Sequence, residues 1–233
     1  MRFISIVGTL LLAGSLGLGC GGSGATPTDA ARDEQPIPSA TALLPWGVGN
    51  RWVYKVTEDG EVSQKETVVG ELEAVGGTGP NRDVQAHRVT TSKSSGAKTV
   101  SWQKVVDARL VRYREQSLRA SDGAVKDEQV WEPPKLHVDE TAEHAVVGAT
   151  WLESSEETNL KDGKTTAATV RDRWTVVAEA ESVTVPAGTF QAVVLQKAGS
   201  GTPKTYWFVR GIGKVKETGG QTEELVSYDI PSR

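Results

Sequence analysis

The chain has 233 residues, of which 37% are hydrophobic and 24% charged, and its 26 Lys and Arg against 30 Asp and Glu give a net charge of -4. This composition suits one sizeable domain or two small ones and excludes a disordered chain. The single cysteine excludes an internal disulfide framework and a multi-cysteine zinc or iron–sulfur site. The acidic balance argues against nucleic acid as a partner.

The N-terminus has the pattern of an export signal. Arg2 precedes an uncharged apolar stretch from Phe3 to Gly19, which ends at the only cysteine, Cys20. The stretch is short and interrupted by glycines, so it is a poor permanent membrane span but a good signal-peptide core. We therefore expect residues 1–19 to be a removed signal peptide.

The segment Leu16-Gly17-Leu18-Gly19-Cys20 resembles a bacterial lipobox. The resemblance implies that Cys20 becomes the acylated first residue of the mature chain, carrying palmitate or similar chains. It departs from the usual pattern because the large aliphatic Leu16 lies four residues before the cysteine rather than three. An ordinary secretory signal with a chance cysteine is the alternative. Acylation would remove a reactive free thiol, and several acyl chains together give stable anchoring.

Residues 20–42 have the composition of a tether. They are rich in Gly, Ser and Pro and lack aromatic residues and apolar periodicity. Gly21 directly after Cys20 hints at sorting to the outer membrane, facing the periplasm. The sequence leaves open the inner membrane, the leaflet and exposure on the cell surface.

From residue 43 onward the apolar residues alternate with period two. In 51–57 the residues Trp52, Tyr54 and Val56 share one face, and 173–180 and 190–195 alternate in the same way. Turn sequences such as Glu58-Asp59-Gly60 and Lys161-Asp162-Gly163 separate such segments. We predict an all-β, mainly antiparallel body: a curved sheet, half-barrel or open barrel of about 10–13 strands. Few or no long helices are expected, with one short helix over 139–147.

The body contains an internal repeat in which matching segments follow the same order in both halves. The matches are Val48–Trp52 with Val147–Trp151, Thr67–Val75 with Thr175–Val183, Gln85-Ala86 with Gln191-Ala192, Trp102 with Trp207, and Val111 with Val215. We interpret 43–233 as a single body built from two similar halves, about 43–136 and 137–233, with roughly five or six strands each.

Three segments carry a family resemblance. They are Leu44–Tyr54, containing Pro-Trp-Gly-Val-Gly-Asn-Arg-Trp-Val-Tyr; Val183–Ala192, containing Val-Pro-Ala-Gly-Thr-Phe; and Trp207–Lys216, containing Trp-Phe-Val-Arg-Gly-Ile-Gly-Lys-Val-Lys. They resemble segments of uncharacterised bacterial envelope lipoproteins, some of which look like the half-barrels of periplasmic lipoprotein carriers. The residues also fit plain structural roles: Pro186 and Gly188 set a turn, Gly211 and Gly213 allow a bulge or turn, and Lys214 and Lys216 point outward.

Few residues suggest chemistry. The histidines His87, His137 and His144 lack zinc-helix spacing, and a weak divalent site beside Asp139, Glu140 and Glu143 is the minor alternative to a solvated loop. The acid groups Glu71 and Glu73, Glu153, Glu156 and Glu157, and Glu179 and Glu181 are interpreted as solvated rather than as a glycosidase pair. A nucleophile elbow, a phosphate-binding loop and a dinucleotide fingerprint are missing from the sequence. We expect no catalytic residue, metal or cofactor.

Two functions remain. The first is a membrane-anchored, non-enzymatic lipoprotein that binds an apolar ligand or lipid on a concave aromatic surface. The residues expected to form that surface are Trp52, Tyr54, Trp102, Trp151, Trp174 and Trp207. The second is a structural or assembly subunit that docks another envelope protein through its sheet. A hydrolase is the least favoured alternative.

Overall fold

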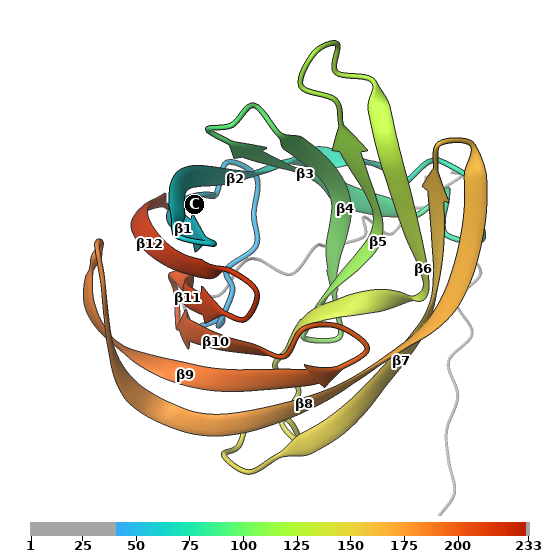
Figure 1. Cartoon of the computed structure of the whole chain (residues 1–233). Coiled ribbons are helices and arrows are strands. Elements are labelled where there is room, and N and C mark those ends of the chain that lie inside the picture. The colour runs from blue at the N-terminus through green and yellow to red at the C-terminus, as the bar shows by residue number, and fades with distance from the viewer. Residues whose placement is uncertain (1–40, 232–233) are drawn as a thin grey trace, which may run out of the picture. The chain divides into compact units, whose positions relative to one another are not determined.

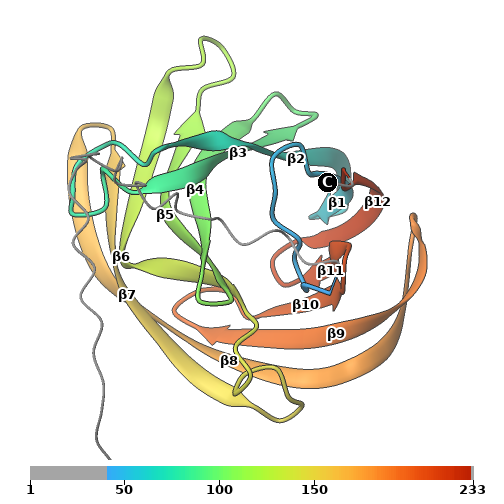
Figure 2. The same ribbon diagram turned by 180° about the vertical axis from the view of Figure 1, so that it is seen from behind.

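The computed structural model describes residues 41–231, so the predictions for the signal peptide, Cys20 and the tether up to residue 40 lie outside the described residues. The described chain forms twelve antiparallel strands and no helix (Figures 1 and 2). The strands are β1 (Arg51–Glu58), β2 (Glu61–Ala74), β3 (Gln85–Lys93), β4 (Lys98–Val106), β5 (Arg109–Leu118), β6 (Val125–Asp139), β7 (Thr150–Lys161), β8 (Lys164–Val185), β9 (Gly188–Gly199), β10 (Lys204–Val209), β11 (Gly213–Thr218) and β12 (Thr222–Asp229).

The strands close into one barrel. Each pairs with its neighbours in the chain, and β1 pairs with β12 from Arg51 opposite Asp229 to Thr57 opposite Thr222. The all-β, antiparallel prediction is confirmed, and twelve strands fall within the predicted number. The sequence predicted an open or half-closed barrel, whereas the β1–β12 ladder closes it. Closure depends on hydrogen bonds between the two ends of the described chain, which local periodicity does not report.

The two halves contain equivalent hydrogen bonds as well as similar sequence segments. Gly49 N donates to Val69 O over 2.9 Å in the first half, and Gly148 N donates to Val176 O over 2.9 Å in the second. Both glycines have a positive φ, 87° and 88°. Strands β1–β6 thus correspond to β7–β12, six strands in each half.

The indole–carboxylate pairs repeat in the same way. Trp102 Nε1 donates to Glu73 Oε1 and Trp207 Nε1 donates to Glu181 Oε1, each over 2.9 Å. A bulge follows each tryptophan, between Trp102 and Gln103 and between Trp207 and Phe208. Because the two bulges lie at matching positions, matching side chains of the two halves point to the same side of the sheet.

The main apolar cluster lies inside the barrel and includes the segment that precedes β1. Leu43 and Trp46 are buried in it, and Trp46 stacks on Trp52 with ring centres 6.0 Å apart. Asn50 is buried and donates from Nδ2 to Pro45 O over 3.0 Å, which fixes the bend of this segment. In Figures 1 and 2 the segment runs inside the ring of strands.

The helix expected over 139–147 is wrong. β6 extends to Asp139, and the residues that follow it form turns. Asp139 Oδ1 accepts from Thr141 N and Thr141 Oγ1, and Asp139 Oδ2 lies 2.8 Å from His144 Nδ1. An aspartate that bonds its own neighbours in this way favours a turn over a helix. Among the described residues no helix is long and apolar enough to cross a membrane.

Candidate functional site

The barrel encloses a cavity of about 450 Å³, and every strand except β7 contributes to its wall. One part of the wall is aromatic and aliphatic: Leu44, Trp46, Trp52, Tyr54, Leu136, Val138, Trp174, Tyr206 and Phe208. The other part carries six basic residues (Lys65, Arg112, Lys135, Lys197, Lys204 and Lys214) but only three acidic ones (Glu115, Glu217 and Glu223). A positively charged interior in a chain of net charge -4 singles this cavity out as the candidate site.

The structure brings three of the six predicted aromatic residues to the cavity, namely Trp52, Tyr54 and Trp174. Trp52 and Tyr54 are held by hydrogen bonds to the β10–β11 region, from Trp52 Nε1 to Ile212 O over 2.6 Å and from Tyr54 Oη to Lys214 O over 3.0 Å. Their position follows from the alternation in β1, which turns both side chains inward.

The other three predicted aromatic residues do not line the cavity. Trp102 belongs to a second, smaller apolar cluster with Val75, Ala86, Val100 and Tyr113. Trp151 stacks between His144 and Trp174, at ring-centre distances of 4.1 and 6.3 Å. Trp207 is held by its hydrogen bond to Glu181. The predicted continuous aromatic surface is therefore divided among separate packing environments.

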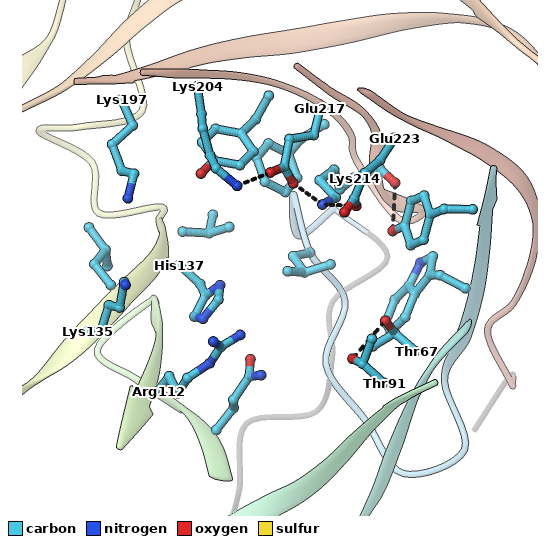
Figure 3. A pocket seen from close by; sticks show the side chains of 18 of the residues that line it. Thr67, Thr91, Arg112, Lys135, His137, Lys197, Lys204, Lys214, Glu217 and Glu223 are labelled. Atoms are coloured by element: carbon cyan, nitrogen blue, oxygen red, sulfur yellow. Dashed lines mark hydrogen bonds and ion pairs between the residues drawn. The ribbon is translucent and has the colours of Figure 1, made fainter. Parts of the chain in front are cut away.

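A chain of ion pairs crosses one side of the cavity (Figure 3). Lys214 Nζ lies 2.8 Å from Glu223 Oε2 and also bonds Glu217. Lys65 pairs with Glu223, and Lys204 pairs with Glu217. The five groups carry three positive and two negative charges, so they leave one positive charge in excess.

The pKa values of this chain follow from burial and mutual attraction. Burial alone would lower the pKa of Lys214, but Glu223 and Glu217 outweigh it and raise that pKa well above its ordinary value. Burial would raise the pKa of Glu223 and of Glu217, but Lys214 in particular holds both below their ordinary value. Burial and the neighbouring Lys214 lower the pKa of Lys65 to about 8. At neutral pH the chain is ionised throughout.

The prediction that Lys214 points outward is wrong. In the β10–β11 pairing, Trp207 lies opposite Lys216 while the next residue, Phe208, lies opposite Lys214. This bulge places two steps of β11 against one step of β10, which changes the face that Lys214 occupies. Lys214 therefore enters the cavity, while Lys216 lies 5.6 Å from the ring centre of Trp207, a residue that does not line it.

A second group of basic side chains faces the cavity from β5 and β6. Arg112 is the cross-strand partner of Lys135, and His137 lies two residues further along β6, at the irregularity that sets Leu136 opposite Val111 and Val138 opposite Leu110. All three side chains line the cavity. Figure 3 shows the three side chains together, apart from the chain of ion pairs. We call Arg112, Lys135 and His137 the basic wall.

The basic wall is incompletely paired. Arg112 Nη1 contacts Glu115 Oε2 at 2.5 Å, but Arg112 Nε and His137 Nε2 are buried without a hydrogen-bond partner. Lys135 Nζ lies 5.0 Å from the ring centre of Trp131, and no carboxylate of the described residues lies within ion-pair distance of it. The nearby Lys197 does have a carboxylate, Asp172, at 3.0 Å.

Burial and neighbouring positive charges lower the pKa values of Lys135 and His137. Burial, Lys197 and Arg112 lower the pKa of Lys135, while Glu157 and Asp172 only partly oppose them. Burial, followed by Arg112 and Lys135, lowers the pKa of His137 well below its ordinary value, so this imidazole is neutral at pH 7. The wall therefore has one carboxylate, Glu115 beside Arg112, and none among the described residues beside Lys135.

The acid groups predicted to be solvated include four structural hydrogen-bond acceptors. Glu73, Glu153, Glu157 and Glu181 accept the indole N–H of Trp102, Trp174, Trp131 and Trp207, respectively. Glu153 also accepts from Leu136 N, and its pKa is raised by burial. Glu153 and Glu157 are partly buried beside tryptophans of adjacent strands, so the prediction of solvated acids is wrong for these two. Glu73 and Glu181 are exposed, as predicted, and bind tryptophans that lie two strands away.

The three histidines have different surroundings. His144 bonds Asp139, whereas His137 faces the cavity. Within residues 41–231 no group of three His, Cys, Asp or Glu side chains could hold a metal ion. His87 Nδ1 lies 2.9 Å from Gly70 O.

Sequence reasoning missed the basic residues of the cavity. The sequence does hold one signal, since Lys135 and His137 stand among the apolar Leu136 and Val138 in β6, and all four line the cavity. The assumption that charged residues face solvent hid this signal, because a barrel interior wide enough to hold a small ligand also has room for polar side chains.

The comparisons with known proteins support the fold. No protein-family model and no curated protein sequence matches the chain. Among solved structures, one from Bacteroides fragilis, described as a "putative exported protein with YmcC-like fold", is similar with a TM-score of 0.50 and 12% sequence identity. The match covers 80% of this chain and 98% of that one. At this identity the likeness shows a shared fold.

Proposed function

We propose that this protein is a non-enzymatic bacterial envelope lipoprotein, anchored through acylated Cys20, whose barrel binds a small ligand with an apolar body. The observation that carries the proposal is the cavity of about 450 Å³ inside the barrel, a size typical of small-molecule sites. Its aromatic side offers flat apolar surface from Trp52, Trp174 and Phe208. The described export of the Bacteroides fragilis neighbour supports the envelope location.

Part of the polar lining of the cavity is occupied by ion pairs. Lys214, Glu217 and Glu223 are held in mutual ion pairs, and a carboxylate locked between lysines is a poor general acid because its pKa is lowered. Docking through a sheet edge, the second function considered, would need an unpaired strand, and every described strand is paired on two sides over at least part of its length. Ligand binding is therefore the function that the geometry supports best.

Native mass spectrometry of the full-length protein, extracted gently from its own membranes, tests the binding proposal. We expect a co-purifying small molecule that is released on unfolding. Consistent absence of any adduct, together with tryptophan fluorescence that added amphiphiles leave unchanged, would contradict it.

Membrane fractionation of Cys20→Ser tests the anchor separately. Loss of the acylated thiol should move the protein from the membrane fraction to the soluble fraction, because the acyl chains supply the binding energy for the bilayer. Unchanged fractionation would show that Cys20 is not the anchor. Ser23→Ala, three residues away, is the matched control and should stay with the membrane.

A further inference from the structure

We infer that the ligand of this cavity is an anionic amphiphile whose single carboxylate or phosphate group binds the basic wall of Arg112, Lys135 and His137. The inference rests on the proposed function, since it names the chemical class of the ligand for the same cavity. It adds to the proposed function that the ligand carries a negative charge and that this charge binds at one defined place, the basic wall.

The charged groups of the cavity wall are paired with one exception. Five of the six basic residues in the cavity wall have a carboxylate partner: Glu223 for Lys65, Glu217 for Lys204, both for Lys214, Asp172 for Lys197 and Glu115 for Arg112. Lys135 is the exception among the described residues. A buried charge without a partner is costly, so an anion that enters the cavity gains most beside Lys135.

The basic wall also holds hydrogen-bond donors that lack acceptors. Arg112 Nε carries a hydrogen that no described group accepts, and it is buried. His137 Nε2 is also buried and unpartnered, and this nitrogen donates in one neutral tautomer and in the charged form. Arg112 and Lys135 are cross-strand partners whose charged heads both lie over the Trp131 ring, 5.9 and 5.0 Å from its centre, and Figure 3 shows His137 on the same side of the cavity. An acceptor-only group such as a carboxylate or phosphate satisfies all three donors at once.

The aromatic side of the cavity offers a surface for the apolar part of the ligand. Tyr206, Phe208 and Trp174 form a continuous set of rings, with centres 5.6 Å apart from Trp174 to Tyr206 and 6.1 Å from Tyr206 to Phe208. Trp52 and Tyr54 lie on the same lining. An alkyl chain or flat ring that leaves the basic wall therefore meets apolar surface. Each lysine of the chain around Lys214 already has a carboxylate partner, so the one positive charge in excess there is shared among three paired lysines.

The test compares three probes on the full-length protein by isothermal titration calorimetry at pH 7: decanoate, the uncharged decanol and inorganic phosphate. Decanoate should bind at least about tenfold more tightly than decanol, as expected for charge-assisted hydrogen bonds in a buried site. Phosphate alone should bind more weakly than decanoate, because it lacks the apolar body. Equal affinities for decanoate and decanol would overturn the inference while leaving the proposed function intact.

Two variants locate the charge. Lys135→Gln should weaken decanoate binding about tenfold or more and leave decanol unchanged. Lys216→Gln is the matched control, because Lys216 also lies over a tryptophan, Trp207, but outside the cavity lining. A decanoate affinity unaffected by Lys135→Gln would overturn the assignment to the basic wall. Failure of both decanoate and decanol to bind, with no co-purified ligand, would instead overturn the proposed function.

Discussion

Lys214 Nζ lies 2.8 Å from Glu223 Oε2 inside the barrel, where only 2% of the Glu223 side chain is exposed. Lys65 bonds the same carboxylate. One glutamate from β12 therefore pairs with lysines from β2 and β11, close to the ladder that closes the barrel between β1 and β12. The charges of the interior are thus part of its structure as well as of its binding surface.

Removal of this carboxylate should destabilise the fold. Glu223→Gln removes the carboxylate that Lys214 and Lys65 share in a buried site. Loss of one partner of a buried ion pair lowers the free energy of unfolding by about 3–5 kcal/mol. Urea unfolding of the full-length protein measures the change. Glu224→Gln is the control, because its pair with Lys55 is partly exposed and is worth less than about 1 kcal/mol. Equal effects of the two variants would contradict a structural role for Glu223.

The same carboxylates predict a loss of stability in acid. Glu223 and Glu217 have pKa values below the ordinary 4.5 in the folded state, since Lys214 favours their charged form. Below about pH 4.5 the unfolded chain binds more protons than the folded one, so the free energy of unfolding falls as the pH falls. Urea unfolding between pH 3 and 7 should show this slope, and Glu223→Gln should reduce it. An identical slope in wild type and variant would assign acid sensitivity to other groups.

Gly213 should tolerate no side chain. Its φ is +108°, and a Cβ there would lie 2.8 Å from Leu44 Cδ1 and 3.1 Å from Trp52 Nε1. Gly213→Ala should therefore cost about 1–3 kcal/mol in unfolding free energy from backbone strain, with displacement of Leu44 in addition. Gly201→Ala is the control, because a Cβ there meets nothing within 4 Å, and it should be close to neutral. Full stability of Gly213→Ala would show that the turn adapts.

Anion binding should weaken as the pH rises. The pKa of Lys135 is lowered by burial, Lys197 and Arg112, with Glu157 and Asp172 opposing. A bound carboxylate favours the charged lysine, so binding is linked to proton uptake and decanoate affinity falls once free Lys135 loses its proton. Calorimetry at pH 7 and pH 9.5 should show this decrease in wild type and a smaller one in Lys135→Gln. Equal decreases in both proteins would place the titrating group elsewhere, for example at Lys65.

The strands themselves could be predicted because their signal is local. Trp52, Tyr54 and Val56 alternate in the sequence, and all three are buried in β1. The turn at Asp59 and Gly60 also has the expected positive φ values, 50° and 84°. Alternation and turn chemistry act over a few residues, so they survive in a single sequence.

The face of each charged residue could not be predicted in the same way. Lys214 enters the cavity because a bulge shifts β11 against β10, and Glu153 and Glu157 bind tryptophans of neighbouring strands. Both effects depend on register between strands, which is set by pairing across the whole barrel. The candidate site was half predicted for this reason: its aromatic side follows local periodicity, and its basic side follows tertiary register.

Anomalous diffraction from a crystal of the protein grown with 10-bromodecanoate tests most directly whether an anionic amphiphile binds inside the barrel with its head group on the basic wall. We expect one ligand inside the barrel, with its carboxylate within hydrogen-bond distance of Lys135 and Arg112 and its bromine against the aromatic side of the cavity. Bromine peaks confined to the outer surface, or a ligand inside the barrel with its carboxylate away from the basic wall, would contradict it.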